Sequence, residues 1–242
     1  SYGIPHGYGA NLLQYRTDIV DPAPTSWGAV FDPASPYAGK VTAYDSPIYI
    51  ADAALYLMKT QPDLGITNPY ALDETQLAAA VELLKAQRGI IGEYWSDYTV
   101  QAQAFTTGDT VIGTSWQVIT GMLQGEDVPV EAILPEEGAT GWSDTWMIAS
   151  GAAHPNCAYL WLDHMADPET NAMATGYFGE APSSQAACDF RTDCEAYHAG
   201  DADYAKQIWY WTTPVAECLD GRTDAVCTDY NAWTQAWQEI KG

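Results

Sequence analysis

The chain has 242 residues, with 9 Lys and Arg against 32 Asp and Glu, and its formal net charge of −23 makes nucleic acid and anionic membrane surfaces poor partners. Hydrophobic residues form 47% of the composition, which excludes a disordered chain, and no apolar run is long enough to span a membrane. An acidic surface attracts cations, so this charge suits either the capture of a cationic ligand or simple solubility.

The first elements expected along the chain are a strand and a helix. Residues 41–44 suit a short strand, and residues 48–59 have the composition of a helix. Ser46 is placed to cap this helix, and Pro47 to occupy its first turn. Asp45 lies in the turn between the two elements.

The next helix has a specific start signal. Asp73 is followed three residues later by Gln76, the pattern of a capping box, and Gly89 marks the expected end of the helix. Buried strands are then predicted over residues 110–115, 128–134 and 146–149.

The last third of the chain predicts further helices. Residues 155–165 and 168–177 each begin with proline, and Asp167 is placed to cap the second of them. A closing helix is expected over residues 228–241. Strands alternating with helices predict an α/β fold with largely parallel sheets, in which ligands bind outside the carboxyl ends of strands. These ends are expected at Tyr44 and Asp45, at Trp116 and at residues 141–144.

The five cysteines follow a pattern typical of an oxidising compartment. Cys188 and Cys194 enclose a short loop, as do Cys218 and Cys227, and we expect each pair to form a local disulfide. Neither pair has zinc-binding spacing or a nearby histidine pair. Cys157 is left over, and its apolar helical surroundings predict a buried free thiol.

Several short segments stand in a specific order along the chain. They are Tyr2 to Pro5, Tyr8 to Gly9, Ser26 to Trp27, residues 37–41, Gly108 to Asp109 leading to Trp116, Pro135 to Gly138, residues 142–144, Asp167 to Glu169 and residues 179–182. As an ordered set across nearly the whole chain, they resemble the spermidine/putrescine-binding proteins of bacterial ABC importers.

The resemblance implies a type II periplasmic-binding-protein fold, an α/β architecture in which two lobes joined by a hinge close over a ligand. Residues 1–14 would form a first-lobe remnant and hinge, 15–140 the second lobe, 141–205 the return to the first lobe, and 206–242 a C-terminal hinge-spanning segment and helix. The family has a further N-terminal part of the first lobe ahead of these segments. We therefore expect either a fragment of a longer protein or a partner that supplies the missing strands.

In that family, aromatic rings box the amines of the ligand and carboxylates from both lobes anchor them. Carried over by position, the matching residues are the strand-end Trp116, the pair Trp142 and Asp144, Asp45 in the acidic turn, and Tyr8 after the first crossing. The residue types suit the chemistry, because an indole face attracts a cation and a carboxylate forms charge-assisted hydrogen bonds with it. Structural alternatives are a core role for the rings and a helix-start role for Asp45.

Three weaker candidates complete the ligand-binding set, namely Tyr49, Glu180 and Trp95. The chain also departs from the family in the acidic turn. A second carboxylate is usual there a few residues on, where this chain has Ile48 and Tyr49. Fewer amine anchors argue against specificity for spermidine.

The expected partners are a small cationic ligand of the putrescine or spermidine type and an ABC permease in the membrane, with the protein itself periplasmic or extracellular. No catalytic residue, metal or cofactor is expected, because the histidines are scattered and no phosphate-binding glycine loop or Gly-x-Ser-x-Gly motif occurs. Two alternatives are a receptor of the same fold for a sugar or compatible solute, and a secreted glycoside hydrolase with paired carboxylates.

Overall fold

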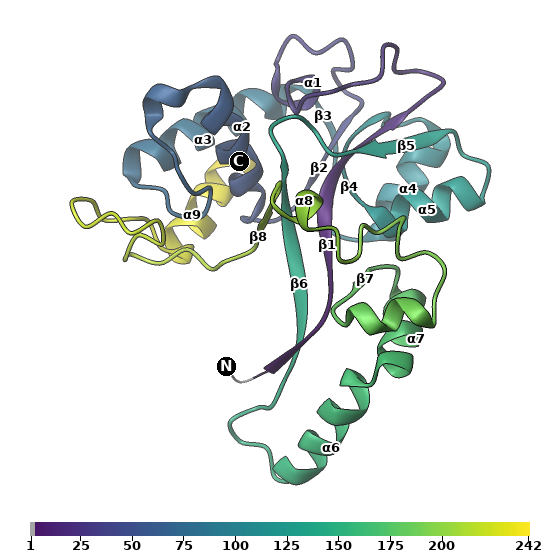
Figure 1. The fold of residues 1–242 in the computed structure, drawn as a ribbon. Helices are drawn as coiled ribbons and strands as arrows, with labels where there is room; N and C mark the ends of the chain where they lie inside the picture. Colours follow the sequence, from purple (N-terminus) through teal and green to yellow (C-terminus); the bar gives the residue numbers. More distant parts are fainter. Residues whose placement is uncertain (1–2) are drawn as a thin grey trace. The chain divides into compact units, whose positions relative to one another are not determined.

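The computed structural model describes residues 3–242 and separates into two compact units (Figure 1). Unit 1 contains the residues up to Ala10 together with Gly141–Tyr210, and unit 2 contains Asn11–Thr140 and Trp211–Gly242. Tyr2, the first residue of the Tyr-Gly-Ile-Pro segment, lies outside the described residues. The predicted lobe boundaries stay predictions.

Unit 2 is built on a mixed sheet. β2 (Val41–Tyr44) pairs in parallel with β3 (Ile91–Trp95) and with β4 (Ile112–Trp116). The C-terminal half of β1 (Gly3–Arg16) pairs antiparallel with β4 and with β5 (Val130–Ile133). Because β2, β3 and β4 run the same way, their carboxyl ends lie at one edge of the sheet.

Helices follow most strands of unit 2. They are α1 (Gly28–Phe31), α2 (Tyr49–Thr60), η1 (Pro62–Leu64), α3 (Glu74–Gln87), η2 (Arg88–Ile90), α4 (Tyr98–Thr107), α5 (Gln117–Gly125) and α9 (Tyr230–Lys241). α3 packs against both α2 and α9, whereas α4 packs against α5 (Figure 1). The fully buried rings of Trp27, Phe31 and Trp233 belong to the core of this unit.

The local helix signals had different outcomes. The capping box of α3 is confirmed, because Asp73 accepts a hydrogen bond from the backbone N–H of Gln76 (3.0 Å) and Gln76 accepts one from that of Asp73 (3.1 Å). The predicted cap of α2 by Ser46 is wrong. The N-cap residue is Ile48, which has no side-chain bond to the helix, because residues 46–49 form a turn before it.

Unit 1 combines an antiparallel sheet with a helical pair. β6 (Ala139–Met147) pairs with the N-terminal half of β1 and with β8 (Ile208–Tyr210), and β7 (Ala181–Pro182) also pairs with β1. The helices are α6 (Pro155–Ala166), α7 (Pro168–Phe178), η3 (Gln185–Asp189) and α8 (Ala202–Ala205). Asp167 caps α7 as predicted, by accepting from the backbone N–H groups of Glu169 and Thr170.

Two expectations about the strands need correction, and two strands were not expected at all. The sheets are not largely parallel, since every pairing of β1 is antiparallel. The strand predicted over 146–149 begins much earlier, at Ala139, and it is not buried at its end, where Met147 is 72% exposed. β1 and β3 were not predicted, because glycine and proline break the apolar pattern of β1 and Gly92 interrupts that of β3.

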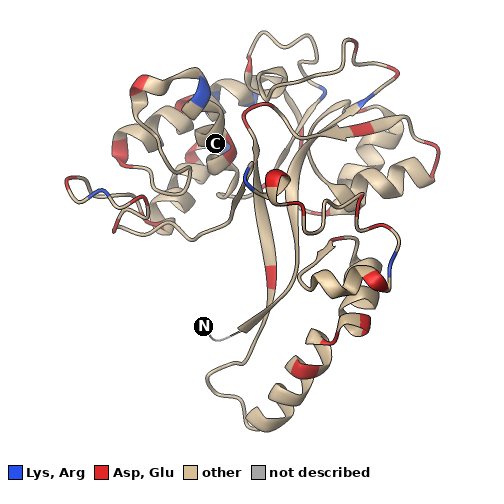
Figure 2. Ribbon diagram, in the orientation of Figure 1, with Lys and Arg blue, Asp and Glu red and all other residues tan. Residues whose placement is uncertain are grey.

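The acidic residues are spread over helices and loops of both units (Figure 2). Among residues 3–242, no helix combines the length and the apolar character that crossing a membrane requires. Apolar side chains are nevertheless exposed on unit 1, and α6 carries three of them, Tyr159, Leu160 and Trp161. Met165 is the buried residue of this helix.

Both predicted disulfides form, Cys188–Cys194 and Cys218–Cys227. The expectation for Cys157 is wrong, because this free cysteine is exposed rather than buried. It lies on α6, whose apolar residues were interpreted as core but are largely open to solvent.

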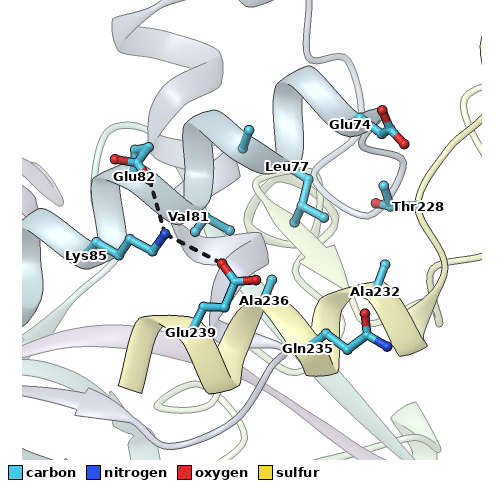
Figure 3. Close-up of a pocket in the computed structure, with 11 residues that line it drawn as sticks. Glu74, Leu77, Val81, Glu82, Lys85, Thr228, Ala232, Gln235, Ala236 and Glu239 are labelled. Carbon is cyan, nitrogen blue, oxygen red and sulfur yellow. Dashed lines mark hydrogen bonds and ion pairs between the residues drawn. The ribbon is translucent and has the colours of Figure 1, made fainter. Parts of the chain in front are cut away.

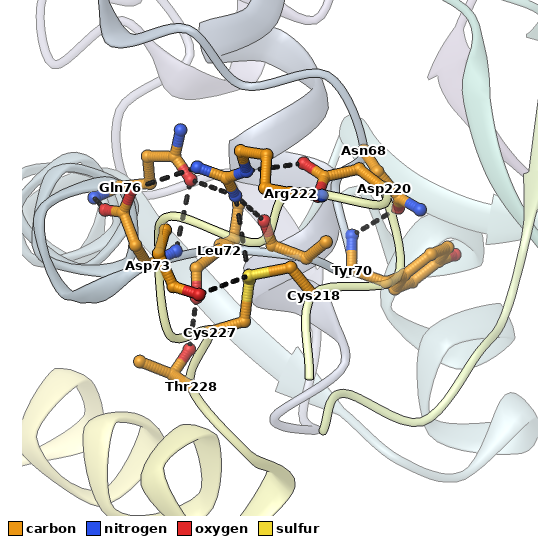
Figure 4. Close-up of a disulfide and its surroundings, with 12 residues drawn as sticks. Asn68, Tyr70, Leu72, Asp73, Gln76, Cys218, Asp220, Arg222, Cys227 and Thr228 are labelled. Atoms are coloured by element: carbon orange, nitrogen blue, oxygen red, sulfur yellow. Dashed lines mark hydrogen bonds and ion pairs between the residues drawn. A yellow bond between two sulfur atoms is a disulfide. The ribbon is translucent and has the colours of Figure 1, made fainter. Parts of the chain in front are cut away.

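Arg222 joins the Cys218–Cys227 loop to the start of α3 (Figure 4). Its guanidinium donates to Asp220 (2.8 Å) and to Asp73 (3.1 Å), and also to the backbone oxygen of Ala71 (2.6 Å) and to Gln76 (3.1 Å). One side chain therefore donates hydrogen bonds to both segments. Two of its acceptors, Asp73 and Gln76, also form the capping box of α3.

Replacing Arg222 with methionine should lower the free energy of unfolding by about 2–3 kcal/mol, because the Ala71 carbonyl loses its donor and Asp220, whose side chain is 6% exposed, loses its cationic partner. Urea unfolding of the oxidised protein measures this change. Lys206→Met is the control: its ion pair with Asp203 is exposed on both sides, so the change should stay within about 0.5 kcal/mol. Equal effects in the two variants would contradict the anchoring role of Arg222.

Candidate functional site

The paired strands β1 and β6 of unit 1 place two predicted site residues on one face. Trp142 lies opposite Gly9 and Asp144 lies opposite Gly7 in the antiparallel register. Because residues two apart in a strand point to the same side, Trp142 and Asp144 share a face of β6.

Gly7 and Gly9 allow two side chains to approach this face closely. A β-carbon at Gly7 would collide with the carboxyl group of Glu180, and one at Gly9 would collide with the indole of Trp142. The glycines therefore leave the space that the carboxyl group and the ring occupy. The predicted residues Trp142, Asp144 and Glu180 are brought together on one side of the β1–β6 pair, and we call these three residues the unit 1 cluster.

Glu180 is the most unusual group of the unit 1 cluster. The residue is 1% exposed, yet within residues 3–242 neither carboxyl oxygen accepts a hydrogen bond. The imidazole Nε2 of His6 lies 3.3 Å from one oxygen. Burial, and secondarily the charge of Asp144, raise the pKa of Glu180 to about 8, against the opposing effect of Arg191.

Asp144 and His6 have shifted pKa values as well. Neighbouring atoms partly shield the carboxyl group of Asp144 from water, which raises its pKa, although the residue as a whole is exposed. The charge of His6 opposes this shift. Burial lowers the pKa of His6, against the effect of Asp144. The ring of His6 also meets that of Trp146 edge-on, with centroids 5.2 Å apart.

Sequence reasoning missed His6 and Trp146. His6 was dismissed for lack of a metal-binding pattern, and Trp146 was assigned to a buried strand. A signal for Trp146 was present, because Trp142, Asp144 and Trp146 alternate at the spacing of one strand face. Only the register of β1 against β6 relates His6 to them.

Tyr8 does not join the unit 1 cluster. It pairs with Ser143, so it lies on the opposite face of the two strands, in a shallow pocket with Ala202 and Tyr210. Its hydroxyl accepts a hydrogen bond from the backbone N–H of Gly200 (3.1 Å). The resemblance suggested one site for Tyr8 and Trp142, but the alternation of side chains along β1 separates them.

In unit 2, three aromatic rings gather where the parallel strands end. Tyr44, Trp95 and Trp116 close β2, β3 and β4, with ring centroids 4.9 to 5.7 Å apart. Trp95 is 1% exposed and belongs to a core cluster with Phe105, so it has no surface to offer a ligand. Tyr44 and Trp116 are only partly buried.

Asp45 and Tyr49 are engaged inside unit 2. Asp45 accepts hydrogen bonds from the indole N–H of Trp237 (3.1 Å) and from the ammonium group of Lys241 (2.8 Å). Tyr49 is 1% exposed, and its hydroxyl accepts a hydrogen bond from Gln87 (2.8 Å). Burial and internal partners thus favour a structural role for both residues.

A groove between α3 and α9 contains none of the predicted site residues. Leu77, Val81 and Ala236 form its apolar part, and glutamates stand at its rim (Figure 3). Lys85 bridges the two helices, because its ammonium group lies 3.3 Å from Glu82 and 3.6 Å from Glu239. The Lys85–Glu239 pair links α3 and α9 at an exposed position, where an ion pair contributes little to stability.

Comparison with solved structures defines the class of fold. A lipoprotein of Treponema pallidum matches with a TM-score of 0.77 at 18% identity, covering 99% of this chain and 69% of that one. The binding protein MotA of Agrobacterium tumefaciens B6, in complex with glucopine, matches with a TM-score of 0.73 at 18% identity, covering 100% of this chain and 71% of that one. The predicted α/β fold of type II periplasmic-binding proteins is confirmed.

The family follows from the sequence. The model of the bacterial extracellular solute-binding proteins matches residues 1–199, and the chain belongs to that family. A putrescine/cadaverine-binding protein of Pseudomonas aeruginosa is 26% identical over 205 residues, covering 78% of this chain and 54% of that protein. The chain thus spans about half the length of the curated relatives it matches.

The raised pKa of Glu180 predicts how stability depends on pH. A carboxyl group with a higher pKa in the folded protein keeps its proton on folding, so the free energy of unfolding falls as pH rises from about 4.5 to about 8. The slope of this contribution reaches about 1.4 kcal/mol per pH unit. Urea unfolding between pH 4.5 and 9 measures it, and Glu180→Gln should remove it.

Asp52 provides a matched control in unit 2. Burial raises its pKa to about 7, against a hydrogen bond from Thr140. Asp52→Asn should therefore flatten the pH dependence below about 7 and leave the part between 7 and 8 unchanged. A Glu180→Gln protein with the unsubstituted slope between pH 7 and 8 would contradict the assignment.

Proposed function

We propose that the chain is the solute-binding part of a bacterial ABC importer and that it binds a small cationic amine of the putrescine class outside the cytoplasmic membrane. The observation that carries this proposal is the unit 1 cluster, in which a buried carboxyl group without hydrogen-bond partners adjoins a second carboxyl group and an indole. Family membership and relatives named for putrescine binding support it.

The chemistry of an alkylamine matches these groups. Its ammonium group needs anionic acceptors, and its methylene groups need an apolar surface that does not compete for hydrogen bonds. Asp144 and Glu180 supply the first, and the ring of Trp142 supplies the second.

Glu180 explains why a cation and not a neutral solute is the proposed ligand. A buried carboxylate without a partner is costly, and this cost is what raises its pKa. An ammonium group beside it would stabilise the ionised form and remove that cost. A sugar hydroxyl would form a hydrogen bond with the carboxyl group but would not stabilise its ionised form, so the alternative of a sugar receptor finds less support in these residues.

Partners and location follow from the same proposal. A receptor of this kind delivers its solute to a permease in the membrane, so we place the protein in the periplasm or at the cell surface. The two disulfides are consistent with an oxidising compartment. The proposal assigns no catalytic step to the chain.

Substitutions in the unit 1 cluster test the amine site. Asp144→Asn should lower the affinity for putrescine by about 10–100-fold, because a charge-assisted hydrogen bond is lost, and Trp142→Ala should lower it by about tenfold. Isothermal titration calorimetry with putrescine, choline and glucose measures these affinities. Tyr8→Phe, on the opposite face of β1, should change them less than twofold. Glucose binding without amine binding would overturn the proposed ligand class.

The affinity for amines should rise with pH. Below about 8, Glu180 is largely protonated and must lose its proton before it can bind an ammonium group, so affinity should increase up to about tenfold per pH unit between 6.5 and 8. Titrations of putrescine at several pH values check this, and Glu180→Gln should bind more weakly with a flat profile over that range. A parallel rise in both proteins would exclude Glu180 from the site.

A further inference from the structure

The last turn of α9 holds a lysine in an unusual setting at the strand ends of unit 2. The ammonium group of Lys241 donates to Asp45 (2.8 Å) and lies 4.0 Å from the centre of the Tyr94 ring. Trp237, one turn earlier on α9, donates its indole N–H to the other oxygen of Asp45 (3.1 Å). Both oxygens of this carboxylate are therefore engaged by one helix.

These contacts are the ones that bind an alkylammonium group. A carboxylate supplies charge-assisted hydrogen bonds, and an aromatic face attracts the cation through its quadrupole. The side chains of Lys241 and Asp45 are 32% and 33% exposed, so the site borders solvent. The ring of Trp237 also meets that of Tyr94 edge-on, with centroids 6.0 Å apart. The exposed pair Lys206–Asp203 shows no such aromatic contact among residues 3–242.

We propose that Asp45, Tyr94 and Trp237 form a binding site for a primary alkylammonium group and that Lys241 fills this site from within the chain. While Lys241 is present, Asp45 is closed to ammonium groups from solution. Lys241 is therefore a specificity-determining residue, because the charge of a solute is then recognised by Asp144 and Glu180. This last consequence rests on the proposed function, whereas the occupied site in unit 2 does not.

The test vacates the site and offers an external cation. Lys241→Ala removes the internal ammonium group, and n-butylammonium chloride is the probe. All variants carry Asp144→Asn and Glu180→Gln, which remove both carboxyl groups of the proposed amine site in unit 1, so the result is independent of the proposed function. Arg88 adjoins Gly242, so the set is repeated with Arg88→Gln to prevent this second cation from replacing Lys241.

We expect n-butylammonium at ten times its dissociation constant to raise the Tm of the Lys241→Ala protein by about 3 °C. The same concentrations of sodium chloride and n-butanol should have no such effect. The protein with Lys241, the Lys206→Ala control and the Lys241→Ala, Asp45→Asn double variant should show no increase. Equal shifts with and without Lys241, or with and without Asp45, would overturn the proposal.

A second measurement needs no vacated site. In the unsubstituted protein, NMR should detect the ammonium protons of Lys241 as a slowly exchanging signal, shifted upfield by the ring current of Tyr94. Tyr94→Leu should remove the upfield shift, and Asp45→Asn should speed the exchange. A Lys241 signal indistinguishable from that of Lys206 would show that the site is not filled and would overturn the proposal even if the Lys241→Ala protein fails to fold.

Discussion

The close approach of Glu180 to the backbone of Gly7 is the constraint on which the chemistry of unit 1 depends. With no β-carbon at Gly7, the carboxyl group lies directly against β1, where it is shielded from water and has no hydrogen-bond donor among the described residues. An unsatisfied buried polar group costs about 1–3 kcal/mol. Folding alone gives no reason to keep such a group. A buried, unsatisfied carboxyl group beside Asp144 and Trp142 supports the proposed cation site.

The carboxylates of unit 2, unlike Glu180, have hydrogen-bond partners within the unit. This difference separates carboxylates with a structural role from the carboxyl group proposed to bind a ligand. Asp45 has internal donors for both oxygens, and Asp52 receives a hydrogen bond from Thr140. Arg222 likewise satisfies Asp220 and Asp73. All these acids gain hydrogen-bond partners on folding, although burial still raises the pKa of Asp52 to about 7. Glu180 is buried on folding without gaining a hydrogen bond. For this reason it is a stronger candidate for ligand binding than Asp45, although the sequence pattern favoured Asp45.

The sequence predicted best what depends on neighbours in the chain. The capping pair Asp73 and Gln76, the cap at Asp167 and the two short disulfide loops each join residues fewer than ten apart, so their patterns are visible in the sequence. β1 and β6 stabilise each other across more than a hundred residues and contain glycines, so neither has a strong strand pattern. The candidate site depends on their register. Trp142 and Asp144 could be grouped from their spacing, but only the pairing of Tyr8 with Ser143 shows that Tyr8 faces away from them.

Composition alone could not separate ligand-binding rings from core rings, because burial requires the fold. Trp95 and Tyr49 fill the interior of unit 2, while Trp142 lies beside two carboxyl groups. The net charge of −23 attracts cations to the whole surface but selects no position. The few basic side chains decide which carboxyl groups already have a cationic partner. Lys241 is bonded to Asp45, and Arg191 bonds to Asp193 and to the backbone oxygen of Glu180, which leaves the carboxyl group of Glu180 without a bond to a lysine or arginine among the described residues. In the proposed function, this is the reason that Glu180 stays available for an ammonium group from solution.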